Sequence, residues 1–164
     1  MNRVYDTELE KSFKMSKSKF TELVRTGILV ITHKDLIKQC WVEDIKINNI
    51  QKRSRLRMTK NISEALAKFE YTSKFYFANN KRIECNACIS QEEYTCLKVI
   101  YKVTPDKVTT KMRHYFYSVS EPTKEIIYSA DFYSENDEVT IEAEFKNNDI
   151  CQKWEIPAWL RENI

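Results

Sequence analysis

Polar and apolar side chains alternate along several stretches of this chain, with the period of two that is typical of an extended strand. The first stretch runs from Val4 to Phe13 and alternates Asp6, Glu8 and Glu10 with bulkier, less polar residues. A strand here would carry three carboxylates on one face. Later stretches repeat this design, with acids, bases or both on the polar face, so they predict a sheet whose polar face is shared.

Eight later stretches of the chain are further strand candidates. They are residues 28–32, 37–42, 53–59, 69–75, 81–89, 109–117, 126–133 and 139–145. The link from Asp44 to Gln51 has no clear pattern. Asn79 and Asn80 supply a turn, so the strands on either side of them are expected to form a hairpin.

Two helices are predicted from capping signals and apolar spacing. The first has Ser16 or Ser18 as its N-cap and ends at Gly27. Ser90 followed by Glu93 is a capping-box pattern that opens the second helix. Each helix has one apolar side, so both are expected to pack on the outside of the sheet. The Trp-rich tail that begins at Trp154 is expected to close one side of the core.

Length and composition fit a single globular domain over residues 1–164. A net charge of +3 is too small to indicate a nucleic-acid surface, and no apolar run has the length of a membrane span or a signal peptide. A cytoplasmic location is expected. The five Cys have no framework spacing, so reduced thiols are expected, and the Cys85-x-x-Cys88 pair lacks the further ligands that zinc needs.

The polar faces together carry more charge than a dry interior tolerates. Their charged residues are Asp6, Glu8, Glu10, Arg53, Arg55, Arg57, Glu70, Lys74, Arg82, Glu84, Lys111, Arg113, Asp131, Glu142 and Glu144. An open sheet would leave this face solvated. Alternatively, about eight antiparallel strands can close into a barrel with an enclosed interior. Such a tunnel would have to be wet and occupied by a ligand of matching charge, because burying charge is costly.

The charge pattern favours a particular ligand if the sheet is closed. Arginines suit phosphate because their planar fork makes paired hydrogen bonds. Carboxylates from the first and last strands, namely Glu8, Glu10, Glu142 and Glu144, could hold Mg or Mn, which prefer oxygen ligands and phosphate. A linear triphosphate with its metal uses both sets.

The order of these motifs resembles the CYTH domain, also called the triphosphate tunnel metalloenzymes. The motifs are E-L-E near the start, R-L-R, Y-T-S-K, R-I-E, K-M-R, the lone Asp in Y-S-A-D-F, I-E-A-E-F and finally I-P-A-W-L. They span the chain from Glu8 to Leu160. The resemblance implies an α+β fold with an eight-stranded antiparallel β-barrel, or tunnel, and helices packed on its outside.

The resemblance also implies roles for individual residues. It makes Glu8, Glu10, Asp131, Glu142 and Glu144 metal ligands, with Glu84 nearby, and makes Arg55, Arg57, Lys74, Arg82, Lys111 and Arg113 the phosphate clamp. Glu8, Glu10, Arg57 and Lys74 are the expected catalytic residues. The implied cofactor is Mg or Mn, and the implied activity is hydrolysis of an inorganic, nucleoside or other organic triphosphate. Related proteins are often dimers, so the resemblance also allows a homodimer.

Ser12 departs from the family pattern, which has a Lys at this position of E-x-E-x-K. In the family that Lys helps to position or activate the attacking water. Lys11 would point to the opposite face and does not replace it, and Asn86 stands where a further acid is common. Two alternatives to a triphosphatase therefore stay open: a class IV-type adenylyl cyclase, and a non-catalytic protein that binds a nucleotide or polyphosphate.

Overall fold

The computed structural model describes residues 4–6, 9–78, 81–121 and 124–164, with backbone only for 4–6. The chain divides into two compact units. Unit 1 comprises Met1–Glu8 and Leu36–Thr110, and unit 2 comprises Leu9–Asp35 and Lys111–Ile164. The prediction of a single domain over the whole chain is not tested by this division and stays a prediction.

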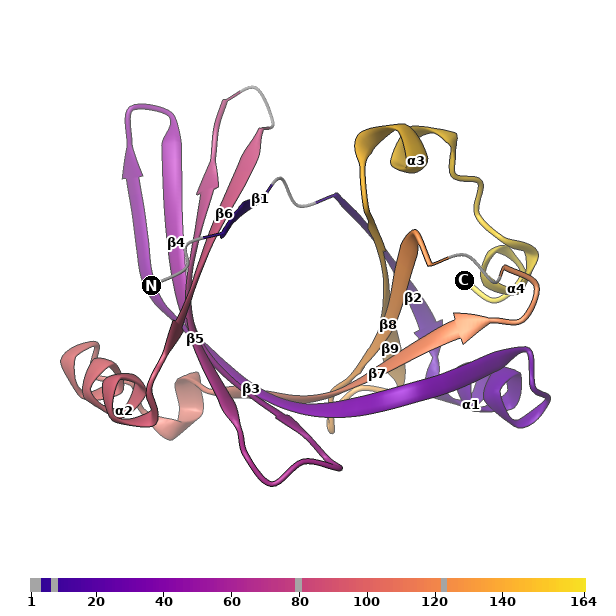
Figure 1. Ribbon diagram of the computed structural model, residues 1–164, viewed down its shortest axis with the longest axis horizontal. Coiled ribbons are helices and arrows are strands. Elements are labelled where there is room, and N and C mark those ends of the chain that lie inside the picture. The colour runs from indigo at the N-terminus through magenta and orange to yellow at the C-terminus, as the bar shows by residue number, and fades with distance from the viewer. Residues whose placement is uncertain (1–3, 7–8, 79–80, 122–123) are drawn as a thin grey trace. The chain divides into compact units, whose positions relative to one another are not determined.

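Unit 1 is built on antiparallel strands in the order β1-β6-β5-β4-β3 (Figure 1). The strands are β1 (Val4–Asp6), β3 (Leu29–Ile47, from Leu36 onward in this unit), β4 (Ile50–Asn61), β5 (Lys68–Tyr76) and β6 (Arg82–Ile89). The predicted hairpin around the Asn79–Asn80 turn is confirmed by the antiparallel pairing of β5 with β6. The turn residues themselves lie outside the described residues.

The region without a clear sequence pattern contains the tight turn between β3 and β4. Asn48 and Asn49 have φ angles of 47° and 59°. Asparagine tolerates this left-handed conformation better than most residues, and two successive positive φ angles give a hairpin turn whose twist matches that of the flanking strands. The strand before this turn, β3, runs without a break from Leu29 to Ile47, so the two predicted segments 28–32 and 37–42 belong to one long strand.

Helix α2 (Gln91–Ile100) packs on the apolar face of the unit 1 sheet (Figure 1). Its capping box is present as predicted: Ser90 Oγ accepts from the Glu93 amide, and Glu93 Oε2 accepts from the Ser90 amide. Tyr94 of this helix joins Cys40 and Leu56 in a small buried core. A short 3-10 turn, η1 (Pro105–Lys107), follows the helix and precedes β7 (Thr109–Ser118).

Unit 2 contains the first part of β3 and the strands that follow it in the order β3-β7-β8-β9-β2. The strands are β2 (Glu10–Ser16), β7 (Thr109–Ser118), β8 (Ile126–Phe132) and β9 (Glu138–Phe145). β9 lies between β8 and β2 and pairs antiparallel with both. Its Val139, Ile141, Ala143 and Phe145 are buried, whereas Thr140, Glu142 and Glu144 face the other way.

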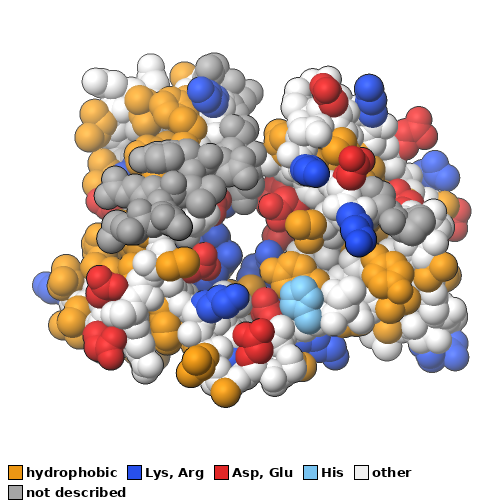
Figure 2. Space-filling model, in the orientation of Figure 1, with side chains coloured by type: hydrophobic (Ala, Val, Ile, Leu, Met, Phe, Trp, Pro, Cys, Tyr) orange, Lys and Arg blue, Asp and Glu red, His pale blue; other side chains and the backbone are white. Residues whose placement is uncertain are grey.

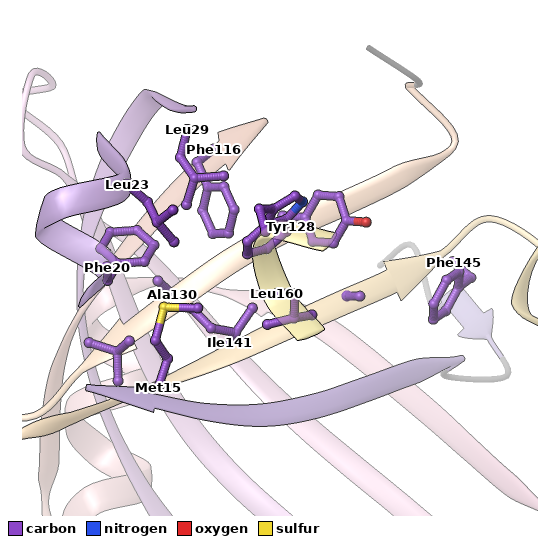
Figure 3. Packing of buried hydrophobic residues seen from close by; sticks show 13 residues of the cluster. Met15, Phe20, Leu23, Leu29, Phe116, Tyr128, Ala130, Ile141, Phe145 and Leu160 are labelled. Carbon is purple, nitrogen blue, oxygen red and sulfur yellow. The ribbon is translucent and has the colours of Figure 1, made fainter. Parts of the chain in front are cut away.

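The apolar face of unit 2 is covered by helix α1 and by the tail of the chain (Figure 3). α1 (Lys17–Arg25) is capped by Ser16 and buries Phe20 and Leu23, and Gly27 follows it with a φ of +76°. The tail forms α3 (Asn148–Lys153) and α4 (Ala158–Arg161). Trp159 and Leu160 belong to the core, so the predicted role of the tail is confirmed.

The α+β class, the antiparallel strands and the helices packed on apolar faces are confirmed. One prediction is corrected: Val4 to Phe13 is not a single strand. β1 pairs with β6 in unit 1, whereas β2 pairs with β9 in unit 2, so the chain changes partners between Asp6 and Glu10.

Among the described helices, none has both the length and the apolar character needed to cross a lipid bilayer.

Candidate functional site

The polar face of unit 1 gathers most of the predicted phosphate-binding residues of β4, β5 and β6. The register places Arg53 opposite Lys74, Arg55 opposite Thr72, and Arg57 opposite Glu70. On the other side of β5, Lys74 lies opposite Glu84, and Thr72 lies opposite Asn86. Because side chains alternate along a strand, these residues share one face of the sheet. We call them the unit 1 polar face.

Glu84 is the carboxylate at the centre of this face. Its oxygens lie 3.0 Å from Lys74 Nζ and 3.7 Å from an Arg55 guanidinium nitrogen, and Asn86 Nδ2 donates to it at 2.9 Å. Burial opposes ionisation of Glu84, but Lys74, Asn86 and Arg55 together outweigh it and hold its pKa below the usual value. Glu84 is therefore a carboxylate at neutral pH, and two predicted clamp residues share it.

Arg55 is 9% exposed, and its Nε has no hydrogen-bond partner among the residues that the structure describes. The guanidinium carbon lies 5.8 Å from the centre of the Trp41 ring, while that of Arg53 lies 4.2 Å from it. A buried donor without a partner costs about 1–3 kcal/mol, and buried polar groups in native proteins are rarely left in this state. An anion bound here would satisfy the Arg55 donor.

Arg57 and Arg82 are placed differently from Arg55. Arg57 donates from Nε and Nη2 to Gln39 Oε1 at 3.3 and 3.1 Å, so a neutral amide helps to hold its guanidinium. Arg82 is exposed at the start of β6, and its guanidinium lies 5.6 Å from the centre of the ring of Tyr76, its cross-strand neighbour. The structure thus brings Arg55 and Lys74 together at Glu84 and places Arg82 at the strand end.

Unit 2 holds a second charged cluster, formed by Lys111, Arg113, Asp131 and Glu142. Arg113 donates to both Asp131 oxygens at 2.6 and 2.7 Å and to Glu142 at 2.6 Å. Lys111 Nζ donates to Asp131 Oδ2 as well. Asp131 is 1% exposed and Lys111 5% exposed, so the carboxylate lies fully buried between two cations. We call this group the unit 2 ion cluster.

The pKa values in the unit 2 ion cluster follow from burial and from the charged neighbours. Burial opposes the ionisation of Asp131, but Arg113 and Lys111 outweigh it and lower its pKa. Burial and the adjacent Arg113 charge lower the pKa of Lys111. For Arg113, burial is outweighed by Asp131 and Glu142, which raise its pKa. The arginine is therefore permanently charged and anchors both acids.

The predicted metal ligands are only partly brought together. Glu10 on β2 lies directly opposite Glu144 on β9, and Ser12 lies opposite Glu142. Like charges in opposite positions repel, so a cation between Glu10 and Glu144 would stabilise the pair. Asp131 and Glu142 instead contact the cations of the unit 2 ion cluster. Glu8 lies outside the described residues.

Within the described residues, no group of three or more acidic, His or Cys side chains is close enough to hold a metal ion. Glu10 and Glu144 supply the oxygen ligands that Mg and Mn prefer, so their chemistry fits such a metal. The two thiols of the Cys85-x-x-Cys88 pair lie on opposite faces of β6, because Cys85 is opposite Ser73 and Cys88 is opposite Glu70.

Several solved structures match this chain over most of its length. The PH1819 protein from Pyrococcus horikoshii OT3 matches with a TM-score of 0.60 and 16% identity, over 88% of this chain and 82% of that chain. A Bacillus halodurans protein named "putative adenylate cyclase" matches with a TM-score of 0.50 and 14% identity, over 90% and 85%. The inorganic triphosphatase NE1496 matches with a TM-score of 0.46 and 17% identity, over 94% and 83%.

The first two matches cover most of both chains. The chain shares the fold of these two proteins, in agreement with the fold that the CYTH resemblance predicts. No family model matches the sequence, and neither does any curated protein. Identities this low establish the fold alone. The site residues that the CYTH resemblance implies therefore stay predictions.

Two features of this chain were not found from the sequence. Trp41 and Gln39, on β3, hold arginines of the unit 1 polar face. Lys14, on β2, is exposed and lies on the same face as Glu10 and Ser12, because it is opposite Thr140. The period of two that linked Glu10 to Ser12 continues to Lys14 and could have identified it.

The predicted orientation of Lys11 is confirmed by the same alternation, and His114 shows it as well. Lys11 points away from Ser12: its Nζ donates to the Cys151 carbonyl at 3.3 Å and lies 5.1 Å from the centre of the Trp154 ring. His114 points away from the unit 2 ion cluster and lies against Phe20 and Phe132. Burial, with a smaller contribution from Lys34, lowers the pKa of His114 to about 4, as expected for a core histidine.

Proposed function

We propose that this protein binds triphosphate compounds and hydrolyses them with the help of a divalent metal. The observation that carries the proposal is the buried Nε of Arg55, which has no hydrogen-bond partner among the described residues. Arg55 and Lys74 both contact the Glu84 carboxylate. A phosphate oxygen would supply the missing acceptor for the Arg55 donor.

Each charged group has a role in this proposal. Arg55 and Lys74 bind phosphate oxygens and neutralise the charge that spreads over them in the transition state. Glu84 keeps both cations oriented through its ion pairs. Within unit 1, Arg57 and Arg82 are proposed as further phosphate ligands. Within unit 2, Lys111 and Arg113 are proposed as phosphate ligands. The unit 2 ion cluster would have to exchange some of its internal ion pairs for phosphate contacts.

Glu10 and Glu144, which lie opposite each other on β2 and β9, would hold Mg or Mn. The metal would neutralise phosphate charge and lower the pKa of a water that attacks the terminal phosphorus. A small triphosphate is proposed as the ligand in preference to a nucleic acid, since the net charge of +3 is modest. An assay that compares inorganic with organic triphosphates identifies the compound that is bound.

Two other outcomes each have an observation in their favour. The match to the protein named "putative adenylate cyclase" favours cyclisation, in which the ribose hydroxyl replaces water as the nucleophile and pyrophosphate leaves. Ser12, exposed on β2 where the family resemblance expects a Lys, favours binding without turnover. Both alternatives keep the same phosphate ligands.

One assay separates these outcomes. Purified protein is incubated with tripolyphosphate, ATP and thiamine triphosphate in the presence of Mg or Mn, and phosphate, pyrophosphate and cyclic AMP are measured. Phosphate release from at least one compound supports the proposal. Formation of cyclic AMP and pyrophosphate from ATP would show that the protein is an adenylyl cyclase and not a triphosphatase. Tight binding without any product would show that the protein binds its ligand and does not turn it over. Absence of both binding and turnover would overturn the triphosphatase, the cyclase and the non-catalytic binding function.

A further inference from the structure

A cavity of about 650 Å³ lies in unit 1 on the face of β5 and β6 that packs toward α2. Tyr71 and Phe75 of β5, Ile89 of β6, and Leu97 and Ile100 of α2 line its apolar part. Figure 2 shows hydrophobic side chains at the surface over α2, with acidic ones beside them. Pockets that bind small molecules usually have volumes of roughly 300–1,000 Å³ and mostly apolar walls. The cavity has the size and lining of a ligand site.

Most side chains that line this cavity lie on the opposite face of β5 and β6 from the unit 1 polar face, and Asn86 is the one polar-face residue at the cavity wall. Ser73 and Cys85, which line the cavity, lie opposite each other in the register, and each stands between two residues of the polar face. Successive side chains of a strand point to opposite faces, so the phosphate ligands Arg55 and Lys74 project from the other side of the same strands. The proposed triphosphate function therefore does not account for the cavity.

The polar end of the cavity presents a hydrogen-bond donor. Lys52 lines it and donates to Glu43 Oε2 at 2.9 Å. The same oxygen accepts from Ser54 Oγ at 3.0 Å and from Tyr71 Oη at 3.4 Å. Three donors thus converge on one carboxylate oxygen, whereas the Lys52 ammonium can donate three hydrogen bonds. A ligand group that accepts a hydrogen bond suits this end better than one that donates.

Charge and shape narrow the ligand class further. The Lys52 charge is balanced by its ion pair with Glu43, and the carboxylate that lines the cavity, Glu93, accepts from the Ser90 amide in the capping box. A charged ligand would have to be desolvated without a counter-charge of its own, which is unfavourable. Tyr71 and Phe75 offer aromatic surface for a flat ring. We propose that this cavity binds small, neutral aromatic molecules that carry one carbonyl acceptor, with the carbonyl at Lys52.

Prodan, a naphthalene dye with a propionyl group, is a suitable probe because its emission shifts to the blue in apolar surroundings. The proposal predicts saturable binding with a blue shift. Ala87→Phe places a ring in the cavity and should reduce affinity by at least about tenfold, which is roughly 1.4 kcal/mol. The matched control is Val99→Phe, which adds a ring on the exposed surface of α2 and should leave binding unchanged. Equal binding by both variants would overturn the proposal.

Lys52→Met tests the carbonyl contact separately. Loss of one hydrogen bond to a charged donor should weaken prodan binding by about tenfold, and the emission of the bound dye should shift further to the blue. Far-ultraviolet circular dichroism must show that both cavity variants are folded. Unchanged affinity and emission in a folded Lys52→Met variant would contradict the assigned orientation of the ligand.

Cysteine alkylation gives a second readout that does not depend on fluorescence. Cys85 and Cys96 line the cavity, whereas Cys88 is exposed on the opposite face of β6. Bound prodan should slow the reaction of N-ethylmaleimide with Cys85 and Cys96 and leave Cys88 unaffected, as followed by peptide mass spectrometry. Uniform protection, or none, would count against the site. Tripolyphosphate should not displace prodan, so failure of the triphosphate function would leave this result intact.

Discussion

Lys74 on β5 and Glu84 on β6 are cross-strand neighbours joined by an ion pair of 3.0 Å. Arg55 approaches the same carboxylate from β4 at 3.7 Å. One acid thus orients two of the cations proposed to bind phosphate, and both are largely shielded from water. The phosphate-binding ability of unit 1 should therefore depend on Glu84 for orientation and on Arg55 and Lys74 for charge.

Glu84→Gln should lower the free energy of unfolding by about 1–3 kcal/mol, because it leaves two nearly buried cations with less compensation. Tripolyphosphate should restore part of this loss, since phosphate oxygens can take the place of the carboxylate. Urea unfolding with and without tripolyphosphate measures both effects. Glu22→Gln, which removes a fully exposed ion pair with Arg25, is the control and should leave stability unchanged. A ligand that stabilises the wild type but not Glu84→Gln would count against the phosphate contacts.

His114 should make the fold sensitive to mild acid. Its pKa in the folded protein is about 4, below the ordinary value of 6.5, because burial disfavours the charged ring. As the pH falls below 6.5, the unfolded chain takes up a proton that the folded chain does not. The free energy of unfolding should therefore fall by up to about 1.4 kcal/mol per pH unit between these two values.

Substitution of His114 isolates this contribution. His114→Phe keeps an aromatic ring against Phe20 and Phe132 and removes the titrating group. The difference in free energy of unfolding between the variant and the wild type should grow as the pH falls from 6.5 to 4 and then level off. Urea unfolding across this pH range measures it. A difference that stays constant with pH would show that His114 titrates normally in the folded protein.

Metal binding should depend on Glu144 and its neighbour across the strands, Glu10. Mn is expected to raise the midpoint of thermal unfolding of the wild type, and Glu144→Gln should abolish most of that rise. Glu138→Gln is the matched control, since Glu138 is an exposed acid on the same strand and lies opposite Ser16. If the two variants respond equally to Mn, the metal does not bind at Glu144.

Ser12→Lys should increase the rate of triphosphate hydrolysis without tightening triphosphate binding. The new ammonium would lie on the face of β2 that carries Glu10, where the family resemblance places a Lys that positions the attacking water. Ser18→Lys adds the same charge on the exposed side of α1 and serves as the control. Phosphate release and affinity are measured for both variants. A tighter but no faster Ser12→Lys protein would mean that the added charge only attracts the ligand.

Alternation of polar and apolar residues was enough to predict most strands, and capping signals with apolar spacing predicted both long helices, because each element packs one face on a core. It also placed Arg55, Lys74 and Glu84 on one face correctly. It did not show that Val4 to Phe13 is divided between two partners, since a strand has the same period whichever strand it pairs with. Nor did it show that Asp131 is buried between Lys111 and Arg113, because that depends on the register of β7 and β8.

The central claim, that Arg55 binds a phosphate oxygen, is tested most directly by calorimetric titration of tripolyphosphate into Arg55→Gln. A lost hydrogen bond to a charged group is worth about 1.5–3 kcal/mol, so the dissociation constant should rise by about 10- to 100-fold. Arg25→Gln, on the exposed surface of α1, should bind like the wild type. Equal affinity of Arg55→Gln and Arg25→Gln for tripolyphosphate would contradict the claim.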